Sequence, residues 1–272
     1  MKEKETIKNQ TKKSKVLKRI GRIALILFIL YTIANIVYMV TSYHADATAK
    51  AALQSDDVVK ISKTNFGWFM DGPSDSEAMI FYPGAKVEVS AYAPILHAIA
   101  GEGMDVFLVD MPYDLAIISP NKADKVISKY SYENWYMGGH SLGGCMAAYY
   151  ASDHADKLKG VILLASYPNK TLGDSLRCIS IFGSEDGILN WARMSGAESY
   201  LPKDTQKYII DGGNHCQFGN YGKQVADKEA EISASEQQKE AVKVIVDWVK
   251  YHEKKNGKAW KALGGQPSGW KI

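Results

Sequence analysis

The stretch Trp135-Tyr136-Met137-Gly138-Gly139-His140-Ser141-Leu142-Gly143-Gly144 decides the fold of this chain. An apolar, strand-like run ends at the serine, and a segment of small residues with helical character (142–154) follows it. A nucleophilic serine needs this context, because it projects from a tight turn in which the residues two before and two after lack a Cβ. Gly139 and Gly143 meet that requirement. The pattern therefore predicts Ser141 as a nucleophile, and its alternative is a glycine-rich turn with an ordinary serine.

Strand-like and helix-like segments alternate through the rest of the chain. The predicted strands are continuously apolar, which is typical of a parallel sheet covered on both faces. They span 78–82, 105–110, 135–139, 161–165, 178–183 and 208–211, with a possible early strand at 58–61. The predicted helices span 89–100, 123–130 and 142–154, and a terminal helix opens at a capping box over 235–238. The sequence therefore predicts an α/β fold with a mostly parallel central sheet flanked by helices.

The motifs at the ends of these strands resemble those of the α/β-hydrolase superfamily, in particular a small, lidless branch similar to dienelactone hydrolases and related serine esterases. The resemblance covers about residues 56–253. It rests on Phe81-Tyr82-Pro83-Gly84-Ala85, Val109-Asp110-Met111-Pro112, Gly139 to Gly144, Gly183-Ser184-Glu185-Asp186 and Gly213-Asn214-His215. Dienelactone hydrolases use a cysteine nucleophile, so Ser141 favours an esterase-like reaction over theirs.

The resemblance implies that an acid and a histidine follow the nucleophile in that order. Asp186 directly follows the predicted strand 178–183, and His215 follows the strand 208–211. Asp186 would orient the imidazole and His215 would act as general base and then general acid. The alternatives to Asp186 are Glu185, Asp174 and Asp211.

Backbone N–H groups are expected to form the oxyanion hole. One donor should be Leu142, the residue after the nucleophile, and the other should follow the strand 78–82. Ala85 is predicted for that second donor, with Lys86 as the alternative. The side chains expected to contact the substrate are His140, Lys86 and Met111.

Composition limits the classes of function. The chain has 272 residues, of which 46% are hydrophobic and 23% charged, as in an ordinary folded domain. Its three cysteines form no CxxC pair, and no metal-spaced or phosphate-cradling motif is present. We therefore expect neither metal nor organic cofactor. Residues 1–22 hold nine lysines and arginines against two glutamates, so the remaining chain is mildly acidic and gives no reason to expect nucleic-acid binding.

The amino end has the pattern of a membrane segment. Residues 23–41 carry no charge and are long enough, at about 1.5 Å per helical residue, to cross a bilayer core of about 30 Å. We expect a transmembrane signal-anchor over 23–43, a cytoplasmic tail over 1–22 and a linker over 44–55. A cleaved signal peptide is the alternative, since 45–47 and 47–49 resemble cleavage sites. Both readings place the domain 56–253 outside the cytoplasm.

These patterns together predict a membrane-anchored serine hydrolase that cleaves an ester, thioester or amide of a small acyl substrate. An acyltransferase acting on a cell-surface acceptor and a non-catalytic binding module are the alternatives. Asp186 lies only 45 positions after Ser141, which leaves little room for a large lid. We therefore expect a shallow, open site in which 166–200 do not bury Ser141. A polar tail with two tryptophans is expected over 254–272.

Overall fold

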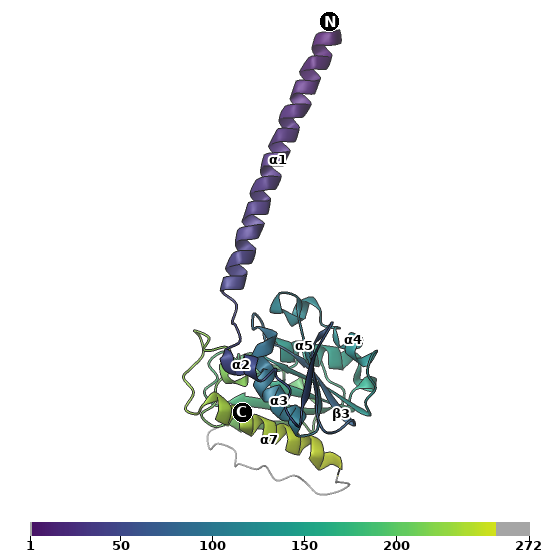
Figure 1. The fold of residues 1–272 in the computed structure, drawn as a ribbon, viewed down its shortest axis with the longest axis vertical. Helices are drawn as coiled ribbons and strands as arrows, with labels where there is room; N and C mark the ends of the chain where they lie inside the picture. Colours follow the sequence, from purple (N-terminus) through teal and green to yellow (C-terminus); the bar gives the residue numbers. More distant parts are fainter. Residues whose placement is uncertain (1, 254–272) are drawn as a thin grey trace. The chain divides into compact units, whose positions relative to one another are not determined.

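The computed structural model describes residues 2–253, with side chains over residues 15–250, and the chain forms two units, Met1–Tyr43 and His44–Ile272 (Figure 1). The second unit is built on one eight-stranded sheet in the order β1-β2-β4-β3-β5-β6-β7-β8. Its strands are β1 (Lys60–Thr64), β2 (Gly67–Asp71), β3 (Glu77–Tyr82), β4 (Asp105–Val109), β5 (Asn134–His140), β6 (Gly160–Leu164), β7 (Arg177–Gly183) and β8 (Gln206–Ile210).

The sheet is mostly parallel, as predicted. Strands β3 to β8 run parallel, and the β1–β2 hairpin adds to β4 in antiparallel register. The strands predicted from 78 onward are confirmed, whereas the possible strand 58–61 begins at Lys60. Strand β2 was not predicted, because its short, half-buried run at Gly67–Asp71 lacks a clear alternation.

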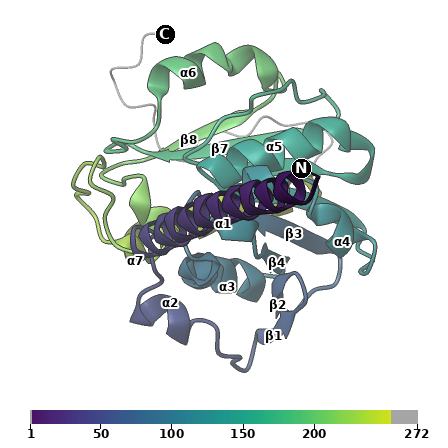
Figure 2. The ribbon, with the colours of Figure 1, turned by 90° about the horizontal axis from the view of Figure 1, so that it is seen from above.

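Helices cover both faces of this sheet (Figure 2). The longer helices are α3 (Ala93–Gly101), α4 (Ala123–Ile127), α5 (Leu142–Asp153), α6 (Trp191–Gly196) and α7 (Ala234–Glu253). The 3-10 helices are η1 (Val89–Tyr92), η2 (Pro112–Asp114), η3 (Ala116–Ile118), η4 (Ala155–Lys157), η5 (Glu198–Tyr200) and η6 (Cys216–Phe218). Helix α5 packs on β3, β5 and β6, while α3 and α7 pack together and against other strands.

Side chains of one strand alternate between these two layers. On β5, Met137 belongs to the core formed with α5. His140 follows three residues later, so its side chain points to the opposite face of the sheet. That side is where Tyr92 and Phe218 contact the His140 ring. Strand β5, which leads into the serine turn, thus places the side chain of His140 in the layer of η1, α3 and η6.

The helix predicted over 89–100 divides into η1 and α3. Pro94 lies in the first turn of α3, where its missing N–H removes no helical hydrogen bond. The terminal helix also begins differently from the prediction. Its capping box is Ser233 with Glu236, whose side chains bond each other's backbone N–H groups, and not 235–238.

The linker expected over 44–55 is wrong for its first half. Residues Ala47–Ala51 form the helix α2, whose N-cap Asp46 accepts a hydrogen bond from the Ala49 N–H. Ala45 donates its N–H to Glu88, and Ala49 is fully buried. The small side chains of this segment let it pack closely on the domain. Linkers have the same polar, alanine-rich composition, so the sequence did not distinguish the two.

The first unit is the single helix α1 (Lys2–Val40). Its part Lys15–Val40 is long and apolar enough to cross a membrane, and none of its most apolar window is buried. A signal sequence near an N-terminus has the same properties, so the helix is a candidate span or signal. The tail predicted over 254–272 lies outside the described residues.

Candidate active site

Ser141 sits at the turn between β5 and α5 with φ 53° and ψ −123°, a left-handed conformation that is strained for a residue with a side chain. The flanking glycines make the turn possible. A Cβ on Gly139 would lie 2.6 Å from the Gly143 carbonyl carbon, and a Cβ on Gly143 would lie 2.2 Å from the Tyr82 carbonyl oxygen. Ser166 also supports the turn, since its hydroxyl donates to the Ser141 carbonyl at 2.8 Å.

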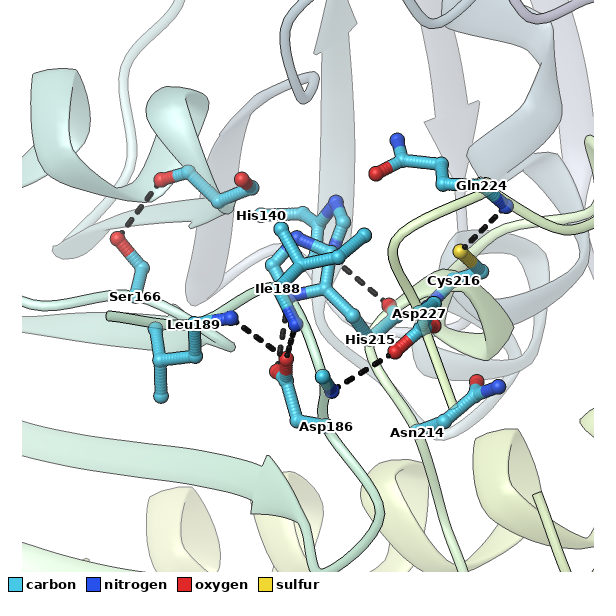
Figure 3. A network of polar contacts seen from close by, with 12 residues as sticks. His140, Ser166, Asp186, Ile188, Leu189, Asn214, His215, Cys216, Gln224 and Asp227 are labelled. Atoms are coloured by element: carbon cyan, nitrogen blue, oxygen red, sulfur yellow. Dashed lines mark hydrogen bonds and ion pairs between the residues drawn. The ribbon is translucent and has the colours of Figure 1, made fainter. Parts of the chain in front are cut away.

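Asp186 lies in the loop after β7 and His215 in the loop after β8, and their side chains point toward each other (Figure 3). His215 Nδ1 lies 2.8 Å from Asp186 Oδ2, and both residues are at most 2% exposed. The other oxygen, Oδ1, accepts hydrogen bonds from the N–H groups of Ile188 at 2.9 Å and Leu189 at 2.7 Å. Because a carboxylate only accepts, Nδ1 carries the imidazole proton and Nε2 keeps its lone pair. The pair can therefore hold a neutral imidazole in the tautomer that a general base needs.

Asp227 ties together the loops that carry this pair. Its Oδ1 accepts from the N–H of Gly187 at 3.0 Å, and its Oδ2 accepts from the N–H of Cys216 at 2.9 Å. These partners directly follow Asp186 and His215 in the chain. Since Asp227 is only 5% exposed, its carboxylate is a buried brace between the acid and the histidine.

The two predicted oxyanion donors lie on adjoining segments. The Leu142 N–H is at the first position of α5, where helical N–H groups have no partner within the helix. Within residues 2–253, the Ala85 N–H also donates to no other group. The Lys86 N–H instead bonds the Asp114 carbonyl at 3.0 Å. Of the two alternatives for the second donor, only Ala85 keeps its amide available.

A cavity of about 700 Å³ opens beside the serine turn. It is lined by Ser141, Leu142, Cys145, Ala165, Ser166, Tyr167, Pro168, Asn169, Ile188, Leu189, Asn190, Arg193, Gly196, Ala197, Tyr200 and His215. The segment 166–200 forms one wall of the cavity through α6 and the loops beside it, and Ser141 remains partly exposed. The site is open, as expected, but walled on one side. Cys145 lines the cavity from α5, and burial raises the pKa of its thiol, which disfavours the thiolate.

The three residues expected to contact substrate do not line this cavity. His140 is fully buried, with Nδ1 2.8 Å from the Tyr92 hydroxyl and Nε2 3.1 Å from the His215 carbonyl. The prediction of a substrate contact for His140 is therefore corrected: strand geometry turns its ring into the layer behind the site. Met111 is also buried, and Lys86 lies on the strained turn after β3, with φ 59°.

Sequence reasoning missed Tyr92, Ser166 and Asp227. They lie between 8 and 48 positions from the residues that they hold, and none belongs to a motif. Asp227 lies in a polar loop segment with several other charged residues, so its burial was not visible in the sequence. No group of three or more His, Cys, Asp or Glu side chains suited to a metal ion occurs in the described part of the chain.

Comparison with known proteins places this chain in a family. A profile described as the Alpha/beta hydrolase family matches residues 78–239. The chain belongs to the α/β-hydrolase family. The matched segment begins at the second residue of β3, extends past β8 and includes every residue of the serine turn, the acid loop and the histidine loop. No match was found among curated proteins compared by sequence.

Solved structures share the α/β-hydrolase fold at low identity. TT1662 from Thermus thermophilus has a TM-score of 0.53 at 11% identity, over 73% of this chain and 99% of its own. MGS-MChE2, an α/β-hydrolase enzyme from a sediment metagenome of the Mar Chica lagoon, scores 0.53 at 13% identity, over 72% and 100%. Dienelactone hydrolase from Anabaena variabilis scores 0.50 at 12% identity, over 71% and 98%. These likenesses support the fold alone.

Proposed function

We propose that this α/β-hydrolase is a serine esterase that cleaves a carboxylic ester, or a related thioester or amide, through an acyl-enzyme on Ser141. The single observation that carries the proposal is the buried Asp186–His215 pair at 2.8 Å, whose imidazole borders the same cavity as a strained serine. A strained turn and a buried, oriented histidine are costly features that a binding module does not need.

In the proposed reaction each of these groups has one role. His215 Nε2 takes the proton of the Ser141 hydroxyl as Oγ bonds to the acyl carbon. The carbonyl electron pair moves onto oxygen, where the N–H groups of Ala85 and Leu142 donate hydrogen bonds to it. When the carbon–oxygen bond to the leaving alcohol breaks, the proton on His215 passes to that alcohol. Water then repeats the sequence on the acyl-enzyme and releases the acid.

Among residues 2–253, the Ser141 hydroxyl has no hydrogen-bond partner, so it is free to rotate toward His215. Catalytic hydrogen bonds commonly tighten only when substrate is bound. The lining of the cavity is mainly apolar, with Leu142, Tyr167 and Leu189 among its members. This apolar lining favours acyl groups of modest size and low polarity over strongly hydrated acyl groups.

A fluorophosphonate probe tests the proposal directly. The full-length chain in detergent should be labelled on Ser141 and should hydrolyse p-nitrophenyl esters, and Ser141→Ala should lose both. Ser128→Ala is the matched control, because its hydroxyl is exposed and bonds only the Lys125 carbonyl. Equal labelling of wild type and Ser141→Ala, with both folded, would rule out the esterase. Release of an ester in the presence of a competing alcohol would identify acyl transfer instead.

The N-terminal helix supports a membrane location for this enzyme, as an uncleaved anchor with the basic end in the cytoplasm. The mass of the mature protein from the membrane fraction tests that part separately. An intact N-terminus supports the anchor, and a chain that starts near residue 48 or 50 shows cleavage of a signal peptide.

A further inference from the structure

We propose that Tyr92 and His140 are positioning residues that join the oxyanion loop to the histidine loop through one buried chain of hydrogen bonds, here called the Tyr92–His140 relay. The relay rests on the proposed function, because its role is to align groups that act on the acyl carbonyl. It consists of Gly84, Tyr92, His140 and His215, which come from the loop after β3, from η1, from β5 and from the loop after β8.

The direction of every bond in the relay is fixed by its ends. The His215 carbonyl can only accept, so His140 Nε2 donates to it across 3.1 Å. A neutral His140 then has its lone pair on Nδ1, which accepts from the Tyr92 hydroxyl at 2.8 Å. The Tyr92 oxygen in turn accepts the Gly84 N–H at 3.0 Å. Each group uses its donor and acceptor once, and no alternative orientation satisfies all three bonds.

Burial enforces this state of the relay. Tyr92 and His140 are both fully buried. Burial, reinforced by the neighbouring His215, holds the pKa of His140 well below its ordinary value, so the ring stays neutral. Its centroid lies 4.6 Å from that of the His215 ring. A charged His140 at this distance would oppose proton uptake by His215, whereas a neutral ring leaves the base free to accept a proton.

The other end of the relay sets the oxyanion loop. A Cβ on Gly84 would lie 2.7 Å from the Tyr92 hydroxyl and 2.9 Å from His140 Nδ1, so the loop backbone rests directly on the relay. The Gly84 N–H is held by Tyr92, and the Lys86 N–H after it is held by Asp114. Between these fixed amides, the Ala85 N–H has no acceptor among the described residues, and we assign it to the carbonyl oxygen of a substrate.

Loss of the relay should therefore lower kcat with little change in KM. Tyr92→Phe leaves the Gly84 N–H and His140 Nδ1 unpaired, and we expect a loss in kcat of roughly 10-fold, a part of the ~10²–10³ that accompanies loss of an oxyanion donor. His140→Gln keeps a donor for the His215 carbonyl but gives Tyr92 no ring nitrogen, so a similar loss is expected. Because both changes break one chain, the double variant should resemble either single variant.

The test measures kcat, KM and the inhibition constant of a trifluoromethyl ketone, which forms a tetrahedral adduct on serine, for the full-length wild type and these variants in detergent. Tyr150→Phe is the matched control: Tyr150 is a buried tyrosine whose hydroxyl bonds Asp124 in α4 and no group of the relay, and the kcat of this variant should not change. Thermal unfolding shows which variants are folded, and His140→Asn, which retains an acceptor near Nδ1, provides another variant if one fails to fold.

The outcomes separate the relay from the esterase itself. Weaker binding of the ketone in parallel with kcat, and a non-additive double variant, support the relay. Wild-type kcat in folded Tyr92→Phe or His140→Gln, or additive losses in the double variant, would overturn it while the esterase stands. If the wild type neither turns over esters nor reacts with a fluorophosphonate, the esterase fails and the relay fails with it.

Discussion

Replacement of Gly143 by alanine tests the packing that brings the serine turn against the oxyanion loop. A Cβ at this position would lie 2.2 Å from the Tyr82 carbonyl oxygen and 2.3 Å from the Pro83 carbonyl oxygen. Cβ atoms do not approach within 3.0 Å of other heavy atoms, so the start of α5 must move by close to the missing distance, roughly 0.8 Å. Both obstacles are backbone atoms, and no side-chain rotation relieves them.

This displacement separates the Leu142 N–H from the loop that carries Ala85. A misplacement of about 1 Å in a catalytic constellation costs ~10²-fold in rate, and overpacking of this kind costs about 1–3 kcal/mol of stability. We therefore expect Gly143→Ala to lower kcat for p-nitrophenyl butyrate by roughly 10²-fold and to lower the midpoint of urea unfolding, both measured on the full-length chain.

Gly173→Ala is the control, because a Cβ there meets only the Ser175 hydroxyl at 3.7 Å, an ordinary contact. Its kcat should equal that of the wild type. If Gly143→Ala retained wild-type kcat and stability, the close approach of α5 to the loop after β3 could not be the arrangement that the active enzyme uses.

The remaining predictions concern charge. Asp186→Asn should lower kcat by up to ~10⁴-fold with little change in folding, because an amide at this position permits the wrong imidazole tautomer; kcat near the wild-type value would mean that another carboxylate orients His215. The pKa of His140 is depressed by burial, so below its ordinary value of about 6.5 the unfolded chain binds a proton that the folded chain excludes. Stability should be complete above that pH and fall as the pH drops below it, and His140→Gln should flatten this part of the melting-temperature profile. Among the residues that the structure describes, Arg193 is the only lysine or arginine that lines the cavity. An ester whose acyl chain ends in a carboxylate should therefore lose kcat/KM severalfold in Arg193→Gln, while a neutral ester of equal length should not; equal losses for both esters would exclude a charge contact.

Features that depend on residues close together in the chain could be predicted from the sequence, and features that depend on distant residues could not. The serine turn could be predicted because its determinants, Gly139 and Gly143, lie within two residues of Ser141. The parallel strands were predictable because burial on both faces leaves a continuous apolar run. Strand β2 and helix α6 were missed, since each is short and depends on neighbours from elsewhere in the chain.

The sequence by itself determined the catalytic candidates and their order, because each follows a predicted strand. Parallel strands bring their carboxyl ends to one edge of the sheet, so residues that follow such strands lie near one another. Only the tertiary structure decided what surrounds them. It turned His140 away from the cavity, joined it to Tyr92 across 48 positions and braced the acid loop with Asp227 across 40. A buried polar group must find a partner wherever the fold offers one, and that choice depends on distances in space which residue spacing along the chain does not encode.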